Sequence, residues 1–192
     1  WTVAREYRWR MMEKWGEYPR IESLAFLSPR DGWAAGRREG AEMLSPLLLH
    51  WDGEEWSEID LGGSEKLCKC ALSALYFRAP NDGWALGGGE KALMLHWDGA
   101  QWTPSYGPES IRLVAAAGTP DGQVWTAGLE SDDFSTIARV AAMHWTGSAW
   151  KTDALPKEST WLRSILMTSS GDGWMAGEGL YHWTGSAWQE VA

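Results

Sequence analysis

Every histidine of this chain stands directly before a tryptophan, and a turn sequence follows each pair. The first instance is LLLHWDGEEW, residues 47–56, which contains His50, Asp52 and two indole rings. An imidazole beside a carboxylate is the composition of an acid–base dyad, an imidazole is also a common metal ligand, and paired aromatic rings can form a platform for a sugar. The phrase returns as LMLHWDGAQW, AAMHWTGSAW and LYHWTGSAW, so its role has to be one that four copies share.

The changes among the four copies favour a structural role for the histidine motif. The residue after His-Trp is Asp in the first two copies and Thr146 or Thr184 in the last two. A threonine hydroxyl can make the local backbone hydrogen bond that Asp makes in a turn, but it cannot replace a catalytic carboxylate. Because equivalent positions of a radial array lie far apart, the four imidazoles are not expected to bind one ion. We expect no metal and no other cofactor.

A second motif, Trp-x-x-Gly, alternates with the first. His-Trp begins at positions 50, 96, 144 and 182, at intervals of 46, 48 and 38 residues, which are typical of four-stranded propeller blades. In each unit an apolar run predicts strand A, Trp-x-x-Gly marks strand B, His-Trp ends strand C and the next tryptophan begins strand D. The two motifs contain the tryptophans that we expect to form the structural core: Trp33, Trp51, Trp56, Trp84, Trp97, Trp102, Trp125, Trp145, Trp150, Trp174, Trp183 and Trp188.

The units predict one all-β domain over residues 1–192, a β-propeller of four-stranded antiparallel blades. The predicted blades cover residues 20–60, 61–106, 107–154 and 155–192. Before them, Trp9 and Trp15 stand at nearly the spacing of a C–D hairpin, so residues 1–19 predict a partial blade. The alternative for this segment is an amphipathic helix, since Val3, Tyr7, Met11 and Trp15 follow an i+4 pattern.

About four and a half blades leave the ring incomplete, because an unfinished blade exposes strand edges. Three solutions remain: the piece comes from a longer propeller, it forms a compact ring of about five blades, or two copies form a homo-oligomer through the incomplete blade. The chain begins with Trp1, which indicates an excised or mature piece.

The turn between Trp51 and Trp56 is predicted in detail. Four residues separate the two rings, a common hairpin loop length, so we expect them to pair across the C–D hairpin. Asp52 is expected to accept a hydrogen bond from a backbone N–H about two residues on, and Gly53 to take a positive φ.

Composition limits the partners. The chain has 26 acidic against 17 basic residues and a formal net charge of −9, which argues against nucleic acid. No apolar run reaches the length of a membrane helix, so membrane insertion is not expected. Cys68 and Cys70, the two cysteines, are interpreted as small buried strand residues rather than as a metal pair or a disulfide, because extended backbone separates them too far for an easy bridge.

The phrase DGWAAG…LLLHWDGEEW resembles the repeats of bacterial Trp-rich propellers, including those of photosystem II assembly-factor type. It is also similar to the Asp-box (BNR) hairpin of sialidases. The likeness covers about residues 20–192 and implies a propeller fold; exported or cell-surface bacterial proteins often contain such repeats. Sialidase catalysis requires an arginine triad, a tyrosine and acidic partners. Arg112 and Arg163 are read as matching strand A positions here, with Glu22 and Ser73 at the other two, so no position matches that set.

Function is predicted at the B–C and D–A loops, which differ from unit to unit while the A–B and C–D turns repeat. The first hypothesis is a non-catalytic binding or scaffold module that presents these loops to a protein partner. The second is a carbohydrate-binding, lectin-like propeller, and the third in order is a glycosidase-like enzyme. Candidate binding residues are Arg37, Arg38, Tyr106, Glu130, Asp132, Asp133, Phe134 and Trp161.

Each candidate also has a structural interpretation. The Asp132 and Asp133 carboxylates suit a solvated loop better than a calcium site, which needs six to eight oxygen ligands. Arg37 and Arg38 are read as exposed hairpin-loop residues balanced by Glu39.

Overall fold

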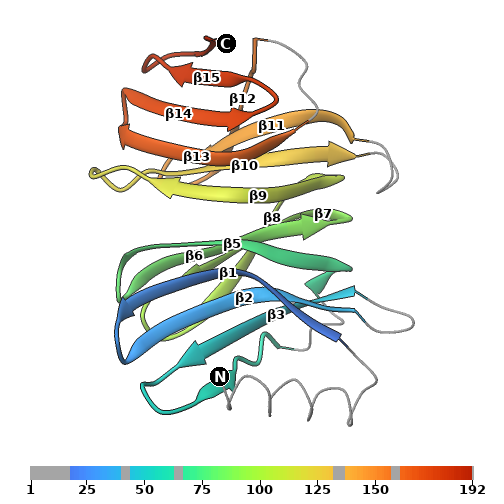
Figure 1. Ribbon diagram of the computed structural model, residues 1–192, viewed down its shortest axis with the longest axis vertical. Helices are drawn as coiled ribbons and strands as arrows, with labels where there is room; N and C mark the ends of the chain where they lie inside the picture. Colours follow the sequence, from blue (N-terminus) through green and yellow to red (C-terminus); the bar gives the residue numbers. More distant parts are fainter. Residues whose placement is uncertain (1–17, 40–43, 63–66, 132–136, 157–160, 192) are drawn as a thin grey trace.

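In the computed structural model, which describes residues 18–39, 44–62, 67–131, 137–156 and 161–191, the chain forms four consecutive four-stranded units (Figure 1). Blade 1 contains β1 (Tyr18–Ser28), β2 (Asp31–Glu39), β3 (Leu44–Trp51) and β4 (Trp56–Glu58). Blade 2 contains β5 (Cys70–Ala79), β6 (Asp82–Gly89), β7 (Lys91–Trp97) and β8 (Trp102–Glu109). Blade 3 contains β9 (Ile111–Gly118), β10 (Val124–Ser131), β11 (Ile137–Trp145) and β12 (Trp150–Asp153). Blade 4 contains β13 (Leu162–Ser169), β14 (Asp172–Gly177), β15 (Leu180–Trp183) and β16 (Trp188–Glu190).

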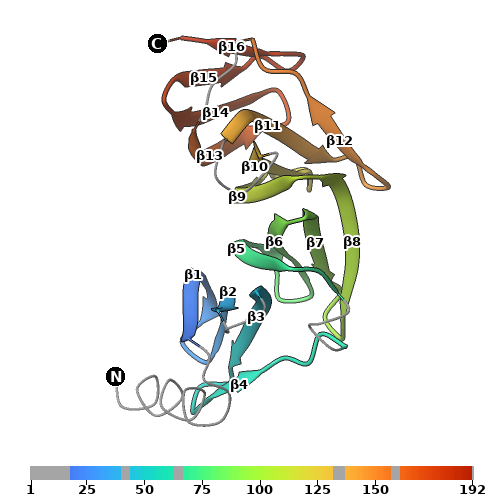
Figure 2. The same ribbon diagram turned by 90° about the vertical axis from the view of Figure 1, so that its right-hand side faces the viewer.

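The four blades follow one another along an arc. Strands pair antiparallel in sequence order within each blade, and a single pairing of Gly88 with Arg112 also joins blades 2 and 3. Figure 2 shows β1, β5 and β9 along the concave side of the arc and β8 and β12 along the convex side. The predicted all-β propeller architecture of four-stranded antiparallel blades is therefore confirmed. The predicted hairpin of residues 1–19 lies almost entirely outside the described residues.

The C–D hairpin has the predicted geometry. Trp51 pairs with Trp56 across the turn, and the ring centroids lie 5.7 Å apart. Asp52 Oδ1 accepts hydrogen bonds from the backbone N–H groups of Glu54 and Glu55 at 2.8 and 2.9 Å, and Gly53 has a φ of 101°. These contacts confirm that the Asp-Gly pair makes the turn.

Threonine replaces aspartate in the later blades, where the Thr146 and Thr184 hydroxyls also bond to the turn backbone by donating to the Ala149 and Ala187 carbonyl oxygens. Thr146 Oγ1 accepts a hydrogen bond from the Ala149 N–H at 3.2 Å. The hydroxyl thus takes the role that was predicted for it, and the residue after His-Trp is a turn residue in both forms.

Tryptophans join each blade to the next. Trp33 of blade 1 lies against both members of the C–D pair of blade 2, with centroid distances of 5.2 Å to Trp97 and to Trp102. The same junction is formed by Trp84 with Trp145 and Trp150, and by Trp125 with Trp183 and Trp188. The inserted rings are 3%, 4% and 1% exposed, so the repeated motifs supply the inter-blade core.

The glycine of Trp-x-x-Gly lies where strand A bulges. An added Cβ on Gly36 would lie 1.9 Å from the Arg20 carbonyl oxygen, and one on Gly87 would lie 1.9 Å from that of Ala71. Strand A has a register shift beside this contact, between Ile21 and Ser23 in blade 1. A bulge bends its strand and re-aims the extra side chain, so this motif positions residues of the inner strands.

The cysteines differ from the expectation. A disulfide joins Cys68 to Cys70, with Cα atoms 5.3 Å apart. The prediction of two unbridged strand residues was wrong because β5 begins only at Cys70 and the backbone bends at Lys69. The bend brings the two Cα atoms within the usual distance for a disulfide, which extended backbone does not.

Candidate functional site

The histidines belong to a contact that is repeated in separate blades. His50 Nε2 lies 2.9 Å from Asp31 Oδ1, and the corresponding distances are 3.0 Å for His96 with Asp82 and 2.7 Å for His182 with Asp172. Each imidazole also stacks on the Trp-x-x-Gly ring of its own blade, at centroid distances between 4.3 and 4.5 Å. The expected structural role fits these contacts. The aspartate, however, comes from the A–B turn and not from the position after His-Trp.

Blade 3 makes the same contact with a different aspartate. Gln123 occupies the position, two residues before Trp125, where the other blades have the turn aspartate. His144 instead places Nδ1 2.6 Å from Asp153 Oδ2 on β12. The side chains of this pair are 14% and 9% exposed. The imidazole therefore has a carboxylate partner in every blade, although the sequence position of that partner changes.

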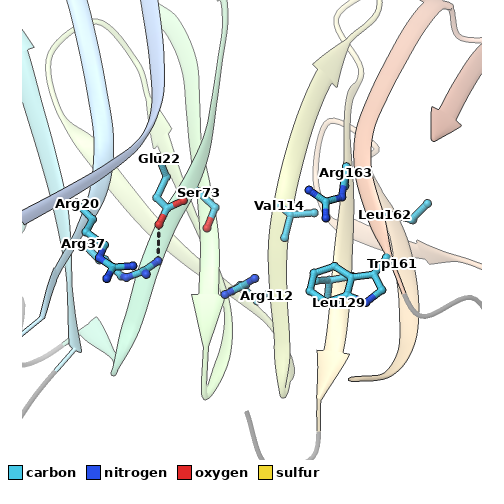
Figure 3. A pocket seen from close by; sticks show the side chains of 10 residues that line it. All are labelled: Arg20, Glu22, Arg37, Ser73, Arg112, Val114, Leu129, Trp161, Leu162 and Arg163. Atoms are coloured by element: carbon cyan, nitrogen blue, oxygen red, sulfur yellow. Dashed lines mark hydrogen bonds and ion pairs between the residues drawn. The ribbon is translucent and has the colours of Figure 1, made fainter. Parts of the chain in front are cut away.

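A pocket of about 630 Å³ lies at the B–C and D–A end of the propeller, between the inner strands of all four blades (Figure 3). Its wall includes four arginines and one glutamate, in a protein whose net charge is −9. The pocket is therefore a local concentration of positive charge on an acidic molecule. The lining residues are Arg20, Glu22, Arg37, Ser73, Arg112, Val114, Leu129, Trp161, Leu162 and Arg163.

Ion pairs largely neutralise the blade 1 wall of the pocket. Arg37 binds Glu22 and also donates from Nε to Glu39 Oε1 at 2.7 Å, and Arg20 Nε lies 3.3 Å from Glu39 Oε2. The hydrogen bond from Arg37 is the largest cause that lowers the pKa of Glu39 below its usual value. Two arginines and two glutamates thus compensate one another on this side.

The opposite wall carries arginines without such compensation. Figure 3 shows Arg112 of β9 and Arg163 of β13 extending into the pocket from neighbouring blades. Within the described ranges neither guanidinium has a carboxylate partner. The Arg163 guanidinium lies 5.7 Å from the ring centroid of Trp161, which is 41% exposed. This wall therefore contains two guanidinium groups and a partly exposed tryptophan.

The strand register corrects the sequence alignment of the inner strands. The Trp-x-x-Gly glycines pair with Ile21, Leu72, Leu113 and Leu162. The bulged residue that follows is Glu22, Ser73 or Arg163 in three blades, and in blade 3 it is Val114. Arg112 lies before this position, in register with Arg20 and Trp161. Matching Arg112 to Arg163 was therefore wrong by two residues. Apolar spacing does not show which residue of β9 is the bulged one.

The structure brings two predicted binding residues into the pocket and leaves others elsewhere. Arg37 and Trp161 line it. Arg38 is buried on the other face of β2 and is paired with Glu58, so the expected exposed loop at these arginines is a strand instead. Tyr106 lies in the outer strand β8, where Lys91 Nζ stands 3.7 Å from its ring centroid.

Most of the acidic loop of blade 3 lies outside the described residues. Glu130 lies near the end of β10. Asp132, Asp133 and Phe134 lie outside the described residues, so the prediction for that loop stays a prediction.

Sequence reasoning missed the residues that reach the pocket from inside the strands. Arg20, Val114, Leu129 and Leu162 were not among the predicted binding residues, and Arg112 and Arg163 were considered only for comparison with sialidases. Two signals were available: arginine recurs near the start of the inner strands, and those starts adjoin the variable D–A loops.

The described part of the chain contains neither a cluster of metal-binding side chains nor a membrane-spanning helix. No group of three or more His, Cys, Asp and Glu side chains could hold a metal ion among these residues. None of the described helical segments is long and apolar enough to cross a membrane.

The comparisons with known proteins rest on structure alone. No protein-family model matches the chain, and no curated protein matches it. The SapL1 lectin, solved in complex with alpha methyl fucoside, is similar at a TM-score of 0.60 and 15% identity, over 91% of this chain and 64% of the lectin. The six-bladed propeller lectin of Aleuria aurantia gives 0.53 and 13%, over 91% of this chain and 62% of that one.

A further similar structure is YCF48 from Cyanidioschyzon merolae, at a TM-score of 0.50 and 13% identity, over 91% of this chain and 72% of YCF48. Enzymes share the fold as well, and a streptogramin B lyase is one of them. The chain spans less than two thirds of the length of either lectin. At these identities the likeness shows the fold alone, and the protein is a β-propeller, a fold that these lectins, YCF48 and the lyase share.

Proposed function

We propose that the protein is a non-catalytic binding module. The pocket between its inner strands, called the axial pocket from here on, holds an acidic segment of a protein partner. The observation that carries this proposal is the pair Arg112 and Arg163, which extend into the pocket without a carboxylate partner among the described residues. Guanidinium groups bind carboxylates with two parallel hydrogen bonds and strong geometric preference. The position of the pocket at the variable-loop end also allows a bound segment to contact those loops.

The chemistry of the two walls supports an extended ligand rather than a lone ion. Carboxylates of the ligand would pair with Arg112 and Arg163, whereas the compensated wall around Arg37 and Glu22 would contribute hydrogen bonds without net charge. The exposed ring of Trp161 adds an apolar contact beside Arg163. A peptide that alternates carboxylates with apolar side chains satisfies these three features together.

The test uses the whole chain and a fluorescently labelled hexaglutamate peptide, with binding followed by anisotropy. Each charged hydrogen bond contributes about 1.5–3 kcal/mol, so the Arg112→Gln/Arg163→Gln variant should lose about tenfold or more in affinity. The binding should weaken as salt is raised, because part of it is electrostatic.

A matched control separates the pocket from general charge effects. Arg30 lies in the A–B turn at the other end of blade 1, so Arg30→Gln removes one charge from a distant place and is compared with the single variants Arg112→Gln and Arg163→Gln. Hexaglutamate affinity that falls equally in Arg30→Gln, or that does not exceed the affinity for a neutral Gly-Ser peptide, contradicts the proposal.

A carbohydrate ligand is the second candidate, favoured by Trp161, which is 41% exposed and lines the pocket. An aromatic face beside a few polar groups is a suitable platform for a sugar ring. Calorimetry with alpha methyl fucoside, the compound in the SapL1 lectin complex, tests one such sugar. Binding that requires Trp161 but survives the Arg112→Gln/Arg163→Gln exchange would favour this function over the first.

A further inference from the structure

The outward face of blade 4 is built like the faces that are buried at the three blade junctions. In blades 1 to 3 the Trp-x-x-Gly tryptophan inserts into the following blade and is at most 4% exposed. Trp174 is the equivalent residue of blade 4, but it is only half-buried. Within the described residues no C–D tryptophan pair packs against it, although its own His182 stacks on it at 4.4 Å as in the other blades.

Other positions on this face are also more exposed than their equivalents in blades 1 to 3. Ala176 is exposed, whereas the equivalent Ala35, Leu86 and Ala127 are each 0% exposed. Val191 follows the strand D tryptophan as Ile59 does in blade 1, where Ile59 packs against the core shared with blade 2. We define the terminal face as Leu166 (61% exposed), Trp174, Ala176 and Val191 (56% exposed).

Side-chain size at the junctions indicates what lies opposite Leu166. Leu166 pairs with Trp174 in the sheet register, and its register equivalents on β1, β5 and β9 are Ala25, Tyr76 and Ala117. Tyr76 and Ala117 each adjoin a strand A residue of the next blade. One member of each pair is large and the other small. Tyr76 lies against Gly118, Ala117 shares a buried cluster with Met167, and the strand registers give Ala25 and Phe77 as the corresponding positions of the first junction.

The Tyr76 junction shows how tight this fit is. An added Cβ on Gly118 would lie 2.0 Å from the Tyr76 ring. At the other junctions Phe77 stacks on Trp33 at 5.6 Å, and Met167 shares a buried cluster with Ala117. Interiors are close-packed and tolerate little extra volume, so the large Leu166 requires a glycine or alanine opposite it.

Blade 1 of a second copy does not meet this requirement. Its residue at the position opposite Leu166 would be Phe26, which would place two large side chains together. Leu24 and Phe26 of β1 are 61% and 55% exposed, so the conflict of size at Leu166 is what argues against this partner.

We propose that the terminal face binds a fifth propeller blade, the next blade of the same ring, with a C–D tryptophan pair around Trp174 and a glycine or alanine opposite Leu166. Each packed junction of this chain is a precedent for that contact. The arc in Figure 2 is not closed, and the chain spans 62% of the length of a six-bladed propeller. The proposal is independent of the ligand of the axial pocket.

The test extends the full chain after Ala192 with a copy of residues 107–154, the blade that carries Gly118 and its own tryptophan pair. Hydroxyl-radical footprinting read by mass spectrometry follows the oxidation of each tryptophan. We expect oxidation of Trp174 to fall to the level of Trp33, Trp84 and Trp125, and the melting temperature to rise.

Two matched variants test the size requirement itself. The extension with Gly118→Phe in the appended copy should leave Trp174 as reactive as in the parent chain, because Phe would meet Leu166. Adding Leu166→Ala to that variant restores a small–large pair and should protect Trp174 again. Protection that is absent from the first extension, or equal in the Phe variant without Leu166→Ala, overturns the proposal.

Sedimentation velocity of the unextended chain tests the other occupant. We expect a monomer with a reactive Trp174. A dimer in which Trp174 is protected and Trp174→Ala dissociates the copies would show that a second copy covers the terminal face, and the proposal of a fifth blade would then be wrong.

Discussion

The two ends of the propeller differ in how much their residues vary from blade to blade. At the A–B and C–D end, closely similar residues recur from blade to blade and form contacts within the blade, such as the His50–Asp31 contact and the Asp52 turn. At the B–C and D–A end, the pocket-lining residue changes from blade to blade, and Arg112 and Arg163 extend into it without carboxylate partners in the described structure. Repetition therefore marks stability in this molecule, and variation marks the candidate site.

The largest expected loss of stability comes from a substitution at a junction between two blades. Trp84→Ala removes a 4% exposed ring that lies against Trp145 and Trp150, and should lower the free energy of unfolding by about 3–5 kcal/mol. Urea denaturation measures the loss. The half-buried Trp174 has no such pair in the described residues, so Trp174→Ala should cost clearly less. Equal losses would mean that the junction pairs do not carry the inter-blade stability.

The second prediction concerns the histidine contact and compares two blades. Asp153→Ala leaves His144 without its partner in a site where the two side chains are 9% and 14% exposed. Asp31→Ala does the same to His50, where the side chains are 34% and 30% exposed. A hydrogen bond to a charged group contributes about 1.5–3 kcal/mol when water is excluded. We expect a loss in this range for Asp153→Ala, measured by thermal melting, and a smaller one for Asp31→Ala. The reverse order would show that burial does not set the strength of this contact.

Much of the repeated end could be predicted from sequence because its causes are local. The spacing of Trp51 and Trp56, the intervening Asp-Gly and the Thr replacements each specify a turn through neighbouring residues. The aspartate partner of each histidine could not be predicted, because it lies across the sheet, 19 residues from His50 and 14 from His96. Blade 3 even supplies it from another strand.

The pocket was harder to predict because it depends on strand register. The bulge places Val114, and not Arg112, opposite the other bulged residues, and apolar spacing cannot show a shift of this size. Arg37 and Arg38 are neighbours in sequence, yet one lines the pocket and the other is paired with Glu58 on the far face. The sequence predicted a site at the variable-loop end, where this pocket lies, but the side chains that line the pocket follow from the fold.

The third prediction uses acid to weaken the repeated turns. Backbone N–H groups of Glu55 and Glu54 hold the pKa of Asp52 below its usual value of 3.8, and those of Gln101 and Ala100 do the same for Asp98. A carboxylate whose pKa is lower in the folded state stabilises the fold above its unfolded pKa and loses that contribution as pH falls through the folded one. We therefore expect stability to decline below about pH 4.

Threonine, the natural residue in blades 3 and 4, provides the matched change for this prediction. Asp52→Thr/Asp98→Thr keeps a local acceptor but removes the two carboxylates, so unfolding followed by circular dichroism should depend less steeply on pH below about pH 4. Glu55→Gln removes a carboxylate from the same turn while it keeps the Asp52 hydrogen bonds, and serves as control. An acid dependence that is identical in all three proteins contradicts this account of the turns.

The smallest expected effect on stability comes from the pocket. Arg163→Gln removes a guanidinium that is exposed and has no carboxylate partner in the described residues, so the free energy of unfolding should change by less than about 0.5 kcal/mol. Arg37→Gln removes a guanidinium that binds both Glu22 and Glu39 and is 17% exposed, and should cost about 1 kcal/mol. Both are measured by urea denaturation. If Arg163→Gln were the more destabilising change, the arginine would hold the fold together, and its place in the binding site would lose its support. The expected order instead separates an arginine that maintains the pocket wall from one that is left available to a ligand.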